Sequence, residues 1–428
     1  MKKRPTVGLF LFIMLSKNSF GYTPGKQFIS SIDFEGNIKT KEFVLEREII
    51  HPIGAPVDSS IIIADRNRLE NLGLFSEVKW RLVPIEDGTL ILQFRVKESI
   101  QRTPPIIFPN YKESTGWSLT GLWLIDNLRG MNQSLDIYGS TGGEGSYGIN
   151  FNDPWIFGNH VSLSLNIGRT IFQHRFLDRV IDLNTFYFSF GRWFGKDIKT
   201  SVGITIDSKK FKKDKVKDSY NYIAPLINVS YDTRDLYWNP GQGALINHSM
   251  YYRKGINVKD WFIAIWTQSY SFYFKLGEKD NSTILALNTT INRKYGDRSE
   301  YWLDYFGNSM NVRGWSLPNQ ELYRSKEQDF RFGHESIHSS IEIRNEIIPK
   351  SVTSLGLEFG LTMVVFADIG MIASRWTNIK DSPQMLGSGI GVRIPAPMFS
   401  VLRIDYAWGR IEKNWNSGTL HLSIGQKF

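Results

Sequence analysis

The feature that most constrains the fold is a two-residue alternation of apolar and polar side chains, which recurs from Pro104 to the end of the chain. The segments 134–140, 161–167 and 201–206 each place their apolar residues on one face of an extended strand. Outside the N-terminus, no apolar run approaches the ~20 residues that a membrane-spanning helix requires. Alternation of this kind suits a closed membrane barrel, which leaves no backbone group unpaired in hydrocarbon, or a soluble β-sandwich.

Aromatic residues favour the barrel over the sandwich. They make up 14% of the chain and gather near expected strand ends, as the girdles of membrane barrels do. The clusters are Phe151 with Trp155 and Phe157, Trp193-Phe194, Tyr237-Trp238, Trp261-Phe262 and Trp302. Turn signals divide residues 104–428 into sixteen antiparallel strands. Because an even number of strands returns the chain to its starting side, both barrel ends are expected in the periplasm.

The first 21 residues have the pattern of a secretory signal peptide. Three cations at positions 2–4 precede an apolar stretch over residues 7–15, and the small residues Ser19 and Gly21 suit a signal peptidase. A short buried helix is the alternative. Removing this segment would lower the formal charge from +9 to +5, since it holds four cations and no acid.

Residues 28–98 follow a different pattern, predicted as β-α-α-β-β. An extended segment ends at Gly36, Thr40 is expected to cap a helical run, and a second helix is expected from Asp58 to Gly73. Two alternating segments then flank a hairpin turn at residues 86–88. This order resembles a POTRA domain, the periplasmic module of outer-membrane assembly and secretion proteins. A small three-stranded sheet leaves an open edge, to which an unfolded client could add a strand.

Charge and cysteine content narrow the chemistry. Much of the positive charge lies in residues 209–217, which are expected to form a solvated loop, with lipid phosphates at a cell surface as the alternative contact. The chain has no cysteine, so disulfides and thiolate chemistry are excluded.

Several motifs resemble the BamA/TamA superfamily of bacterial surface antigen barrels, and together they span the barrel region. They are Asp126-Asn127-Leu128-Arg129-Gly130 at an early turn, Asn152-Asp153-Pro154-Trp155 at the end of the fourth strand, and Asp232-Thr233-Arg234-Asp235, with Pro240 and Gly243, at the central turn. The resemblance implies an outer-membrane barrel. The opposite charges of the central turn are expected to pair locally, in a structural role.

The most specific motif is Val312-Arg313-Gly314-Trp315, within a loop from about 296 to 330 that is longer than a barrel turn requires. In the resembled family this loop folds back into the lumen, where its arginine meets an acidic residue on the wall. The resemblance assigns that role to Asp368, with Glu342 as a second partner. A charge-assisted bidentate pair would make Arg313 and Gly314 a latch for the loop. An ordinary surface arginine is the alternative.

The chain ends with apolar residues at every second position from Leu420 and with an aromatic terminus, which resembles a barrel-targeting signal. In the resembled family the last strand pairs only partly with the first, so a weak seam is expected between residues 104–112 and 419–428. The candidate seam residues are Ile106, Ile107, Leu420, Leu422, Ile424 and Phe428. Prolines at 104, 105 and 109 cannot donate ladder hydrogen bonds, which would weaken the seam.

Two patterns imitate catalytic motifs. His334-Glu335-Ser336-Ile337-His338 has the letters of a zinc-protease motif, but that motif requires a helix. Alternation around it predicts a strand, on which the two histidines would stand ~13 Å apart. Gly387, Gly389 and Gly391 share one strand face, where close backbone approach explains them better than phosphate binding. No catalytic triad, metal cage or nucleotide loop is recognisable, so an enzyme, a metal and a cofactor are not expected.

We therefore expect an outer-membrane protein that inserts or translocates client polypeptides by strand templating at the seam. A dedicated two-partner secretion transporter is the first alternative, and a passive porin is the second. The expected partners are unfolded outer-membrane or secreted polypeptides, outer-membrane lipid, and periplasmic chaperones or accessory lipoproteins, but not nucleic acid. Room for a single POTRA-like domain suggests a short, specialised member of the resembled family.

Overall fold

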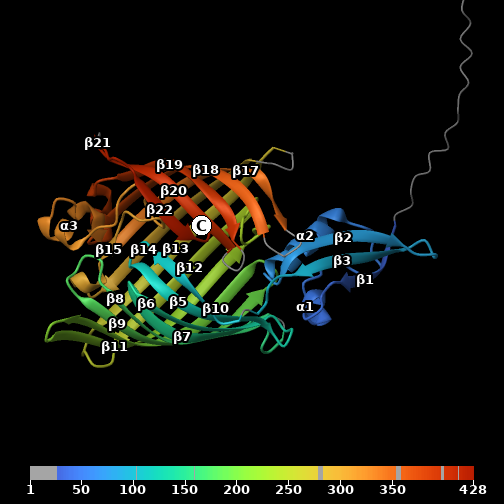
Figure 1. Ribbon diagram of the computed structural model, residues 1–428, viewed down its shortest axis with the longest axis horizontal. Coiled ribbons are helices and arrows are strands. Elements are labelled where there is room, and N and C mark those ends of the chain that lie inside the picture. Colours follow the sequence, from blue (N-terminus) through green and yellow to red (C-terminus); the bar gives the residue numbers. More distant parts are fainter. Residues whose placement is uncertain are drawn as a thin grey trace, which may run out of the picture.

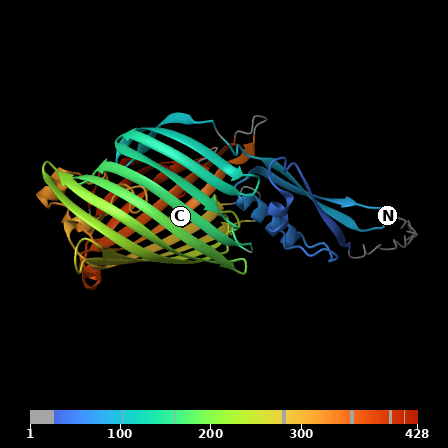
Figure 2. The same cartoon turned by 90° about the horizontal axis from the view of Figure 1, so that it is seen from below.

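The computed structural model describes residues 27–102, 104–158, 160–277, 283–352, 358–396, 400–412 and 414–428. These residues form a small N-terminal domain and a closed β-barrel, which Figure 1 and Figure 2 show end to end. We call the barrel end that faces the N-terminal domain the proximal end and the other the distal end. The signal peptide expected over residues 1–21 lies outside the described residues.

None of the helices in the described ranges combines the length and apolar character needed to cross a membrane.

The N-terminal domain has the predicted β-α-α-β-β order. Its elements are β1 (Ile29–Glu35), α1 (Glu42–Glu46), α2 (Ser59–Asn71), β2 (Phe75–Pro84) and β3 (Leu90–Glu98). The central strand β3 pairs in parallel with β1 and antiparallel with β2. Leu92 and Phe94 of β3 are fully buried, and Ile62 and Leu69 of α2 belong to the same apolar cluster. This cluster is the core of the domain.

One detail of the N-terminal prediction is wrong. Helix α1 spans only Glu42–Glu46, and its N-cap is Lys41 rather than Thr40. The Thr40 hydroxyl instead donates a 2.6 Å hydrogen bond to Glu98 at the end of β3. Side-chain hydrogen bonding to a distant strand therefore replaces the local capping bond.

The barrel sheet contains seventeen strand elements in the described residues. They are β4 (Ile106–Lys112), β5 (Gly116–Leu128), β6 (Gln133–Gly142), β7 (Glu144–Asp153), β8 (Val161–Gln173), β9 (Val180–Phe194), β10 (Ile198–Lys213), β11 (Val216–Asp232), β12 (Gly243–Gly255), β13 (Phe262–Leu276), β14 (Thr283–Gly296), β17 (Glu335–Val352), β18 (Glu358–Ala373), β19 (Met385–Ala396), β20 (Ser400–Ile411), β21 (Asn414–Trp415) and β22 (Thr419–Ile424). Elements β21 and β22 pair with successive parts of β20, so they occupy one position. The described barrel thus has sixteen strand positions, as the turn signals predict.

Strand register decides which side chains face the lumen. In β13 the buried residues Ser271 and Tyr273 point inward, whereas Phe272 and Phe274, which are 38% and 48% exposed, point outward. The same alternation gives β17 an inward face with Glu342 and Arg344 and an outward face that is largely apolar. A polar lumen and an apolar outer surface are what a membrane barrel requires.

The structure corrects the expectation for one segment and confirms it for another. Most of the basic run 209–217 is not a loop but the tight β10–β11 hairpin, in which Lys212 forms an ion pair with Asp182 at 2.5 Å. His338 lies in β17 and His334 just before it, so the zinc-protease letters lie on a strand, as the alternation predicts.

The proximal turns of the barrel hold the N-terminal domain at two places. The side-chain amide of Asn127, at the end of β5, donates to Thr40 at 2.8 Å, and the backbone oxygen of Gly130 in the β5–β6 turn accepts from Lys41 at 2.9 Å. In the β11–β12 turn, the backbone N–H of Tyr237 donates to Asn71 at the end of α2. Both turns contain motifs on which the family resemblance rests.

Candidate functional site

A long loop between β14 and β17 enters the barrel from its distal end. It contains η1 (Glu300–Trp302), β15 (Asp304–Tyr305), α3 (Gln320–Ser325), η2 (Asp329–Arg331) and β16 (Phe332–Gly333). Figure 1 shows α3 at the end opposite the N-terminal domain. Phe306, Val312 and Trp315 pack with Ile372 and Met385 of the barrel wall in one apolar cluster. The loop is therefore fastened inside the lumen by apolar contacts as well as by charge.

Arg313 occupies the centre of this contact and is fully buried. Its Nε and Nη2 donate to the two carboxylate oxygens of Asp368 at 2.8 and 2.9 Å, and its Nη1 donates to Glu342 at 2.7 Å. Nη1 also lies 3.2 Å from Asp405 of β20, a partner that the sequence did not suggest. Burial alone disfavours the charged guanidinium, but Asp368 and Glu342 keep the pKa of Arg313 above its usual value.

The ion pairs around Arg313 extend into a larger group, which we call the lumen cluster. Its members are Arg313, Arg344, Arg393, Arg403 and Lys427 as cations, with Glu342, Asp368 and Asp405 as anions. Five cations thus face three carboxylates, all of them buried. Among the described residues, Nη1 and Nη2 of Arg344 have no hydrogen-bond partner, although its guanidinium lies 5.1 Å from the Phe428 ring centroid. Cation–π contact partly replaces the missing bonds.

Glycines on the wall make room for the loop. A Cβ on Gly387 of β19 would lie 2.0 Å from the backbone oxygen of Arg313, and one on Gly370 of β18 would lie 2.6 Å from Val312. Gly314 has a φ of +88° and faces the backbone of β20 equally closely. The predicted role of Gly387 in close backbone approach is confirmed, and the approaching backbone is that of the loop.

The loop also touches both sides of the seam between the last and first strands. His421 of β22 accepts a 2.9 Å hydrogen bond from the Gly314 N–H at Nε2, and its Nδ1 lies 2.7 Å from Glu113, just after β4. Since Nε2 accepts, the ring hydrogen lies on Nδ1, which donates a hydrogen bond to Glu113. The second oxygen of Glu113 accepts from Ser309 of the loop at 2.9 Å. Burial opposes the charge of Glu113, but the bonds from His421 and Ser309 lower the pKa of its carboxyl.

The seam itself is weakly paired. β4 has seven residue pairs with β5, and β22 has six with β20. β22 and β4 are hydrogen-bonded neighbours in the closed sheet, but within the described residues they touch over a much shorter stretch than either does with its other partner. A cavity of about 460 Å³ lies at this place, bounded by the end of β4, by β22 and by the loop near Met310. The seam therefore combines a short strand contact with side-chain contacts to the loop.

The expected seam residues separate into two groups. Ile107 is 74% exposed and Leu420 is 57% exposed on the outer face of the seam strands, where Leu422 and Ile424 also point, whereas Ile106 points inward. Phe428 does not lie in the seam. Strand β22 ends at Ile424, Gly425 turns the chain inward, and the Phe428 ring lies 6.4 Å from Tyr273 across the lumen.

The last residues also join the lumen cluster. Lys427 donates to Asp368 at 2.8 Å and to the backbone oxygen of Asn311 in the loop. Asp368 therefore holds the loop through Arg313 and the end of the chain through Lys427. Because Lys427 follows β22, displacing the end of the chain would break its ion pair with Asp368, the carboxylate that anchors the loop.

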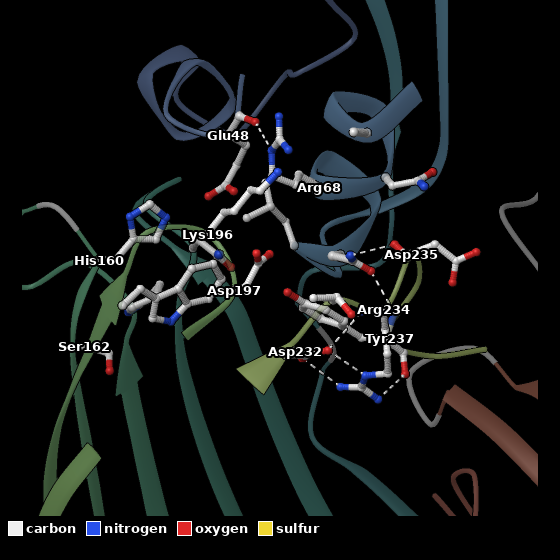
Figure 3. A pocket seen from close by; sticks show the side chains of 18 of the residues that line it. Glu48, Arg68, His160, Ser162, Lys196, Asp197, Asp232, Arg234, Asp235 and Tyr237 are labelled. Carbon is white, nitrogen blue, oxygen red and sulfur yellow. Dashed lines mark hydrogen bonds and ion pairs between the residues drawn. The ribbon is translucent and has the colours of Figure 1, made fainter. Parts of the chain in front are cut away.

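A second cavity, of about 460 Å³, lies at the proximal end between the N-terminal domain and the barrel turns. Figure 3 shows Glu48 and Arg68 entering it from the domain, with His160, Asp232 and Tyr237 on the barrel side. Burial raises the pKa of Glu48 against the opposing effect of Arg47. Arg234 and Asp232 pair at 2.9 and 3.0 Å, as the central-turn motif predicts. This cavity carries charges of both signs at the mouth of the lumen.

Comparison with known proteins identifies the architecture. Residues 127–428, more than half of the chain, match the Omp85 superfamily domain. The chain belongs to the Omp85 superfamily. Residues 27–99 match the POTRA family, described as a surface antigen variable number repeat. The N-terminal unit of this Omp85 chain is therefore a POTRA domain, and the resemblance inferred from the motifs is confirmed.

Individual relatives of this Omp85 chain are distant. Outer membrane protein assembly factor BamA of Neisseria meningitidis serogroup B is 26% identical over 155 residues, which cover 36% of this chain and 19% of that protein. The chain thus aligns with about a fifth of the length of that curated relative.

Three solved structures share the fold. BamA from Haemophilus ducreyi lacking POTRA domains 1–3 has a TM-score of 0.57 at 16% identity, over 92% of this chain and 83% of that one. CdiB from Acinetobacter baumannii has a TM-score of 0.53 at 18% identity, over 93% and 73%. CdiB from Escherichia coli has a TM-score of 0.54 at 12% identity, over 96% and 92%.

The motifs of the Omp85 chain revealed only part of the site. They brought together Arg313, Asp368 and Glu342, whereas Asp405, His421 and Glu113 were missed. One signal was available: Arg403 and Asp405 are the two charged residues in the otherwise largely apolar segment 401–408, and their spacing of two places both on one face of a strand. Within the described residues, no group of three or more His, Asp or Glu side chains is arranged to hold a metal.

Proposed function

We propose that this Omp85 chain is an outer-membrane assembly factor that folds and inserts client polypeptides by strand templating at the β4–β22 seam. The observation that carries the proposal is the short contact between β22 and β4 in the described residues, beside full ladders on both other sides. An edge with unpaired N–H and C=O groups is a template for an incoming strand. No bond is made or broken in a client, so the chain is proposed not to be an enzyme.

Features of the first strand support opening at this place. Pro109 lies within β4 and cannot donate a ladder hydrogen bond. The cavity beside the seam lies between Lys112, Met310 and Ser423, next to the strand edge that a client would use. The contacts of His421 and Glu113 with the loop would then decide how readily the edge becomes free.

The location and partners follow from the same proposal. The barrel would lie in a bacterial outer membrane with its POTRA domain in the periplasm. Its partners would be unfolded outer-membrane or secreted polypeptides and the surrounding lipid, with periplasmic chaperones or accessory lipoproteins delivering clients. The cavity of mixed charge below the POTRA domain would lie on the path of entry.

A dedicated two-partner secretion transporter is the second candidate. The chain has the fold of two CdiB proteins over 93% and 96% of its length, which keeps this candidate open. A passive porin is disfavoured because the loop and the lumen cluster occupy the lumen.

Reconstitution tests the proposal. The purified chain in lipid vesicles should accelerate insertion of an unfolded eight-stranded barrel, measured as protease protection, and a chain with a covalently closed seam should not. Equal insertion rates with and without the chain would contradict assembly activity. Depletion in the native host separates the candidates: loss of many outer-membrane proteins supports assembly, loss of one secreted protein supports transport, and loss of small-solute uptake alone supports a porin.

A further inference from the structure

A group of polar side chains lies on the outer face of the barrel, away from the lumen and the seam. Strand register brings them together near the middle of β12, β13 and β14 and in the first part of β17: His248 is opposite Gln268, Tyr270 is opposite Thr289, and Thr289 is opposite Ser339. We call these five residues the outer polar patch.

The orientation of the outer polar patch follows from its neighbours. Ser271 and Asn288, one position away from Tyr270 and Thr289, are buried and point into the lumen. Phe272, two positions from Tyr270, and Ile341, two positions from Ser339, point outward and are 38% and 43% exposed. Since side chains alternate along a strand, the patch shares the outward face with these apolar residues.

The hydrogen bonds within the outer polar patch are incomplete. The Tyr270 hydroxyl donates to the side-chain oxygen Oε1 of Gln268 at 3.1 Å, and the hydroxyls of Thr289 and Ser339 lie 2.8 Å apart. The His248 ring packs edge-on against Tyr270 at 5.6 Å. Among the described residues, neither the ring nitrogens of His248 nor the side-chain NH2 of Gln268 has a hydrogen-bond partner. Two polar groups are therefore available on a surface that would face lipid, if this barrel spans a membrane as its family does.

Hydrocarbon offers no partner for these groups. An unsatisfied donor or acceptor at mid-membrane depth is costly, because neither water nor lipid chains replace the missing bond. Polar and ionisable side chains at such depths are rare and most often bond to other protein groups. The molecule that covers this face must therefore offer polar groups at the same depth, and a lipid acyl chain has none.

We propose that the outer polar patch is the contact face of a homodimer within the membrane, in which His248 and Gln268 of each copy hydrogen-bond to Gln268 and His248 of the other. Two copies inserted in the same orientation are related by a two-fold axis along the membrane normal, which brings residues of equal depth together. One ring nitrogen of His248 accepts, and the Gln268 NH2 donates, so the patch is complementary to itself.

The surface next to the patch also suits a contact between two proteins. An apolar groove of about 450 Å³ lies on the same face, where the pair Met250–Trp266 follows His248–Gln268. It begins where Pro225 interrupts the register between β11 and β12. In the dimer this groove receives apolar side chains that protrude at equal depth from the second copy.

Single cysteines test the proposal cleanly, because the chain has none of its own. Met250→Cys lies beside His248, and Ile149→Cys on β7 is a matched control, since these two apolar side chains are 44% and 49% exposed on different parts of the outer face. Oxidation in lipid vesicles at low protein density should give disulfide-linked dimers of Met250→Cys and only the random background for Ile149→Cys. Equal yields at the two positions would overturn the proposal.

A second measurement tests the polar contacts themselves. The double variant His248→Leu, Gln268→Leu should fold, as judged by heat-modifiable gel mobility. Its dimerisation in vesicles, measured by fluorescence resonance energy transfer between labelled copies, should be about tenfold weaker, which is the effect expected from losing two intramembrane hydrogen bonds. Unchanged dimerisation of this folded variant would remove the patch from the contact. Cross-links in cells that join Met250→Cys to a different protein, or a purely monomeric wild-type chain with bound lipid, would replace the second copy with that occupant.

Discussion

Replacing Arg313 with alanine should destabilise the folded barrel by about 3 kcal/mol, and the value follows from the contacts in the lumen cluster. Removing one member of a buried ion pair costs about 3 to 5 kcal/mol, because the remaining charge stays desolvated. Here the stranded carboxylates keep other cations, since Lys427 remains 2.8 Å from Asp368 and Arg344 remains 2.9 Å from Glu342. The expected loss therefore lies at the lower end of that range.

Equilibrium unfolding in urea from lipid vesicles, followed by tryptophan fluorescence and gel mobility, measures this loss. Arg313→Lys should lose about half as much, because it keeps the charge but not the bidentate geometry. Arg324→Ala is the matched control in the same loop. Its side chain is 65% exposed and pairs with Asp178 only at 3.6 Å, so its loss should stay below about 0.5 kcal/mol.

A double-mutant cycle makes the test specific. Asp368→Asn combined with Arg313→Ala should be less destabilising than the sum of the single variants, with a coupling energy of at least about 1 kcal/mol. Additive losses, or an Arg313→Ala barrel as stable as the Arg324→Ala control, would refute the view that this arginine holds the loop.

Three further predictions concern other parts of the molecule. Gly387→Ala should displace the loop and lower the heat-modification temperature as Arg313→Ala does, because its Cβ would meet the backbone oxygen of Arg313 at 2.0 Å. The control Gly145→Ala, whose Cβ meets nothing closer than 3.8 Å, should leave that temperature unchanged, and equal behaviour of the two variants would count against loop docking. Glu113→Gln should speed disulfide formation between single cysteines on β4 and β22, because it weakens the contact with His421, whereas an unchanged rate would show that this contact does not restrain the seam. Burial and nearby Lys209 lower the pKa of His174 from 6.5 to about 4, and its neutral ring accepts a hydrogen bond from the backbone N–H of Leu177 at 3.2 Å. The contribution of His174 to folding stability is therefore complete above pH 6.5 and falls by up to about 3 kcal/mol as the pH drops toward 4. Hydrogen exchange of the distal β8–β9 turn should show this loss in the wild-type chain but not in His174→Asn.

Much of the fold was predictable because alternation reports directly which face of a strand is buried. Alternation predicts a strand over residues 161–167, yet β8 continues to Gln173, because β9 pairs with it up to that residue, beyond the point where the two-residue alternation breaks. Strand ends depend on the partner strand and on turn geometry, neither of which alternation contains. The α1 cap failed for a similar reason, because Glu98 competes for Thr40 from 58 positions away.

The candidate site was less predictable than the fold. A local motif led to Arg313, and a short acidic motif led to Asp368. Lys427 reaches Asp368 only because Gly425 turns the chain inward after β22, and His421 reaches Gly314 across 107 positions of sequence. Contacts of this kind arise from barrel closure, which places the last strand beside both the first strand and the loop.

The central claim is that the β4–β22 seam is the working edge of the barrel. Because the chain contains no cysteine, one cysteine in residues 106–112 and one in 419–424 can close that edge with a disulfide that a reductant reopens. The decisive measurement is client insertion by the same reconstituted sample before and after reduction. We predict background insertion when the seam is oxidised and full recovery when it is reduced; insertion at the wild-type rate through a covalently closed seam would contradict the account.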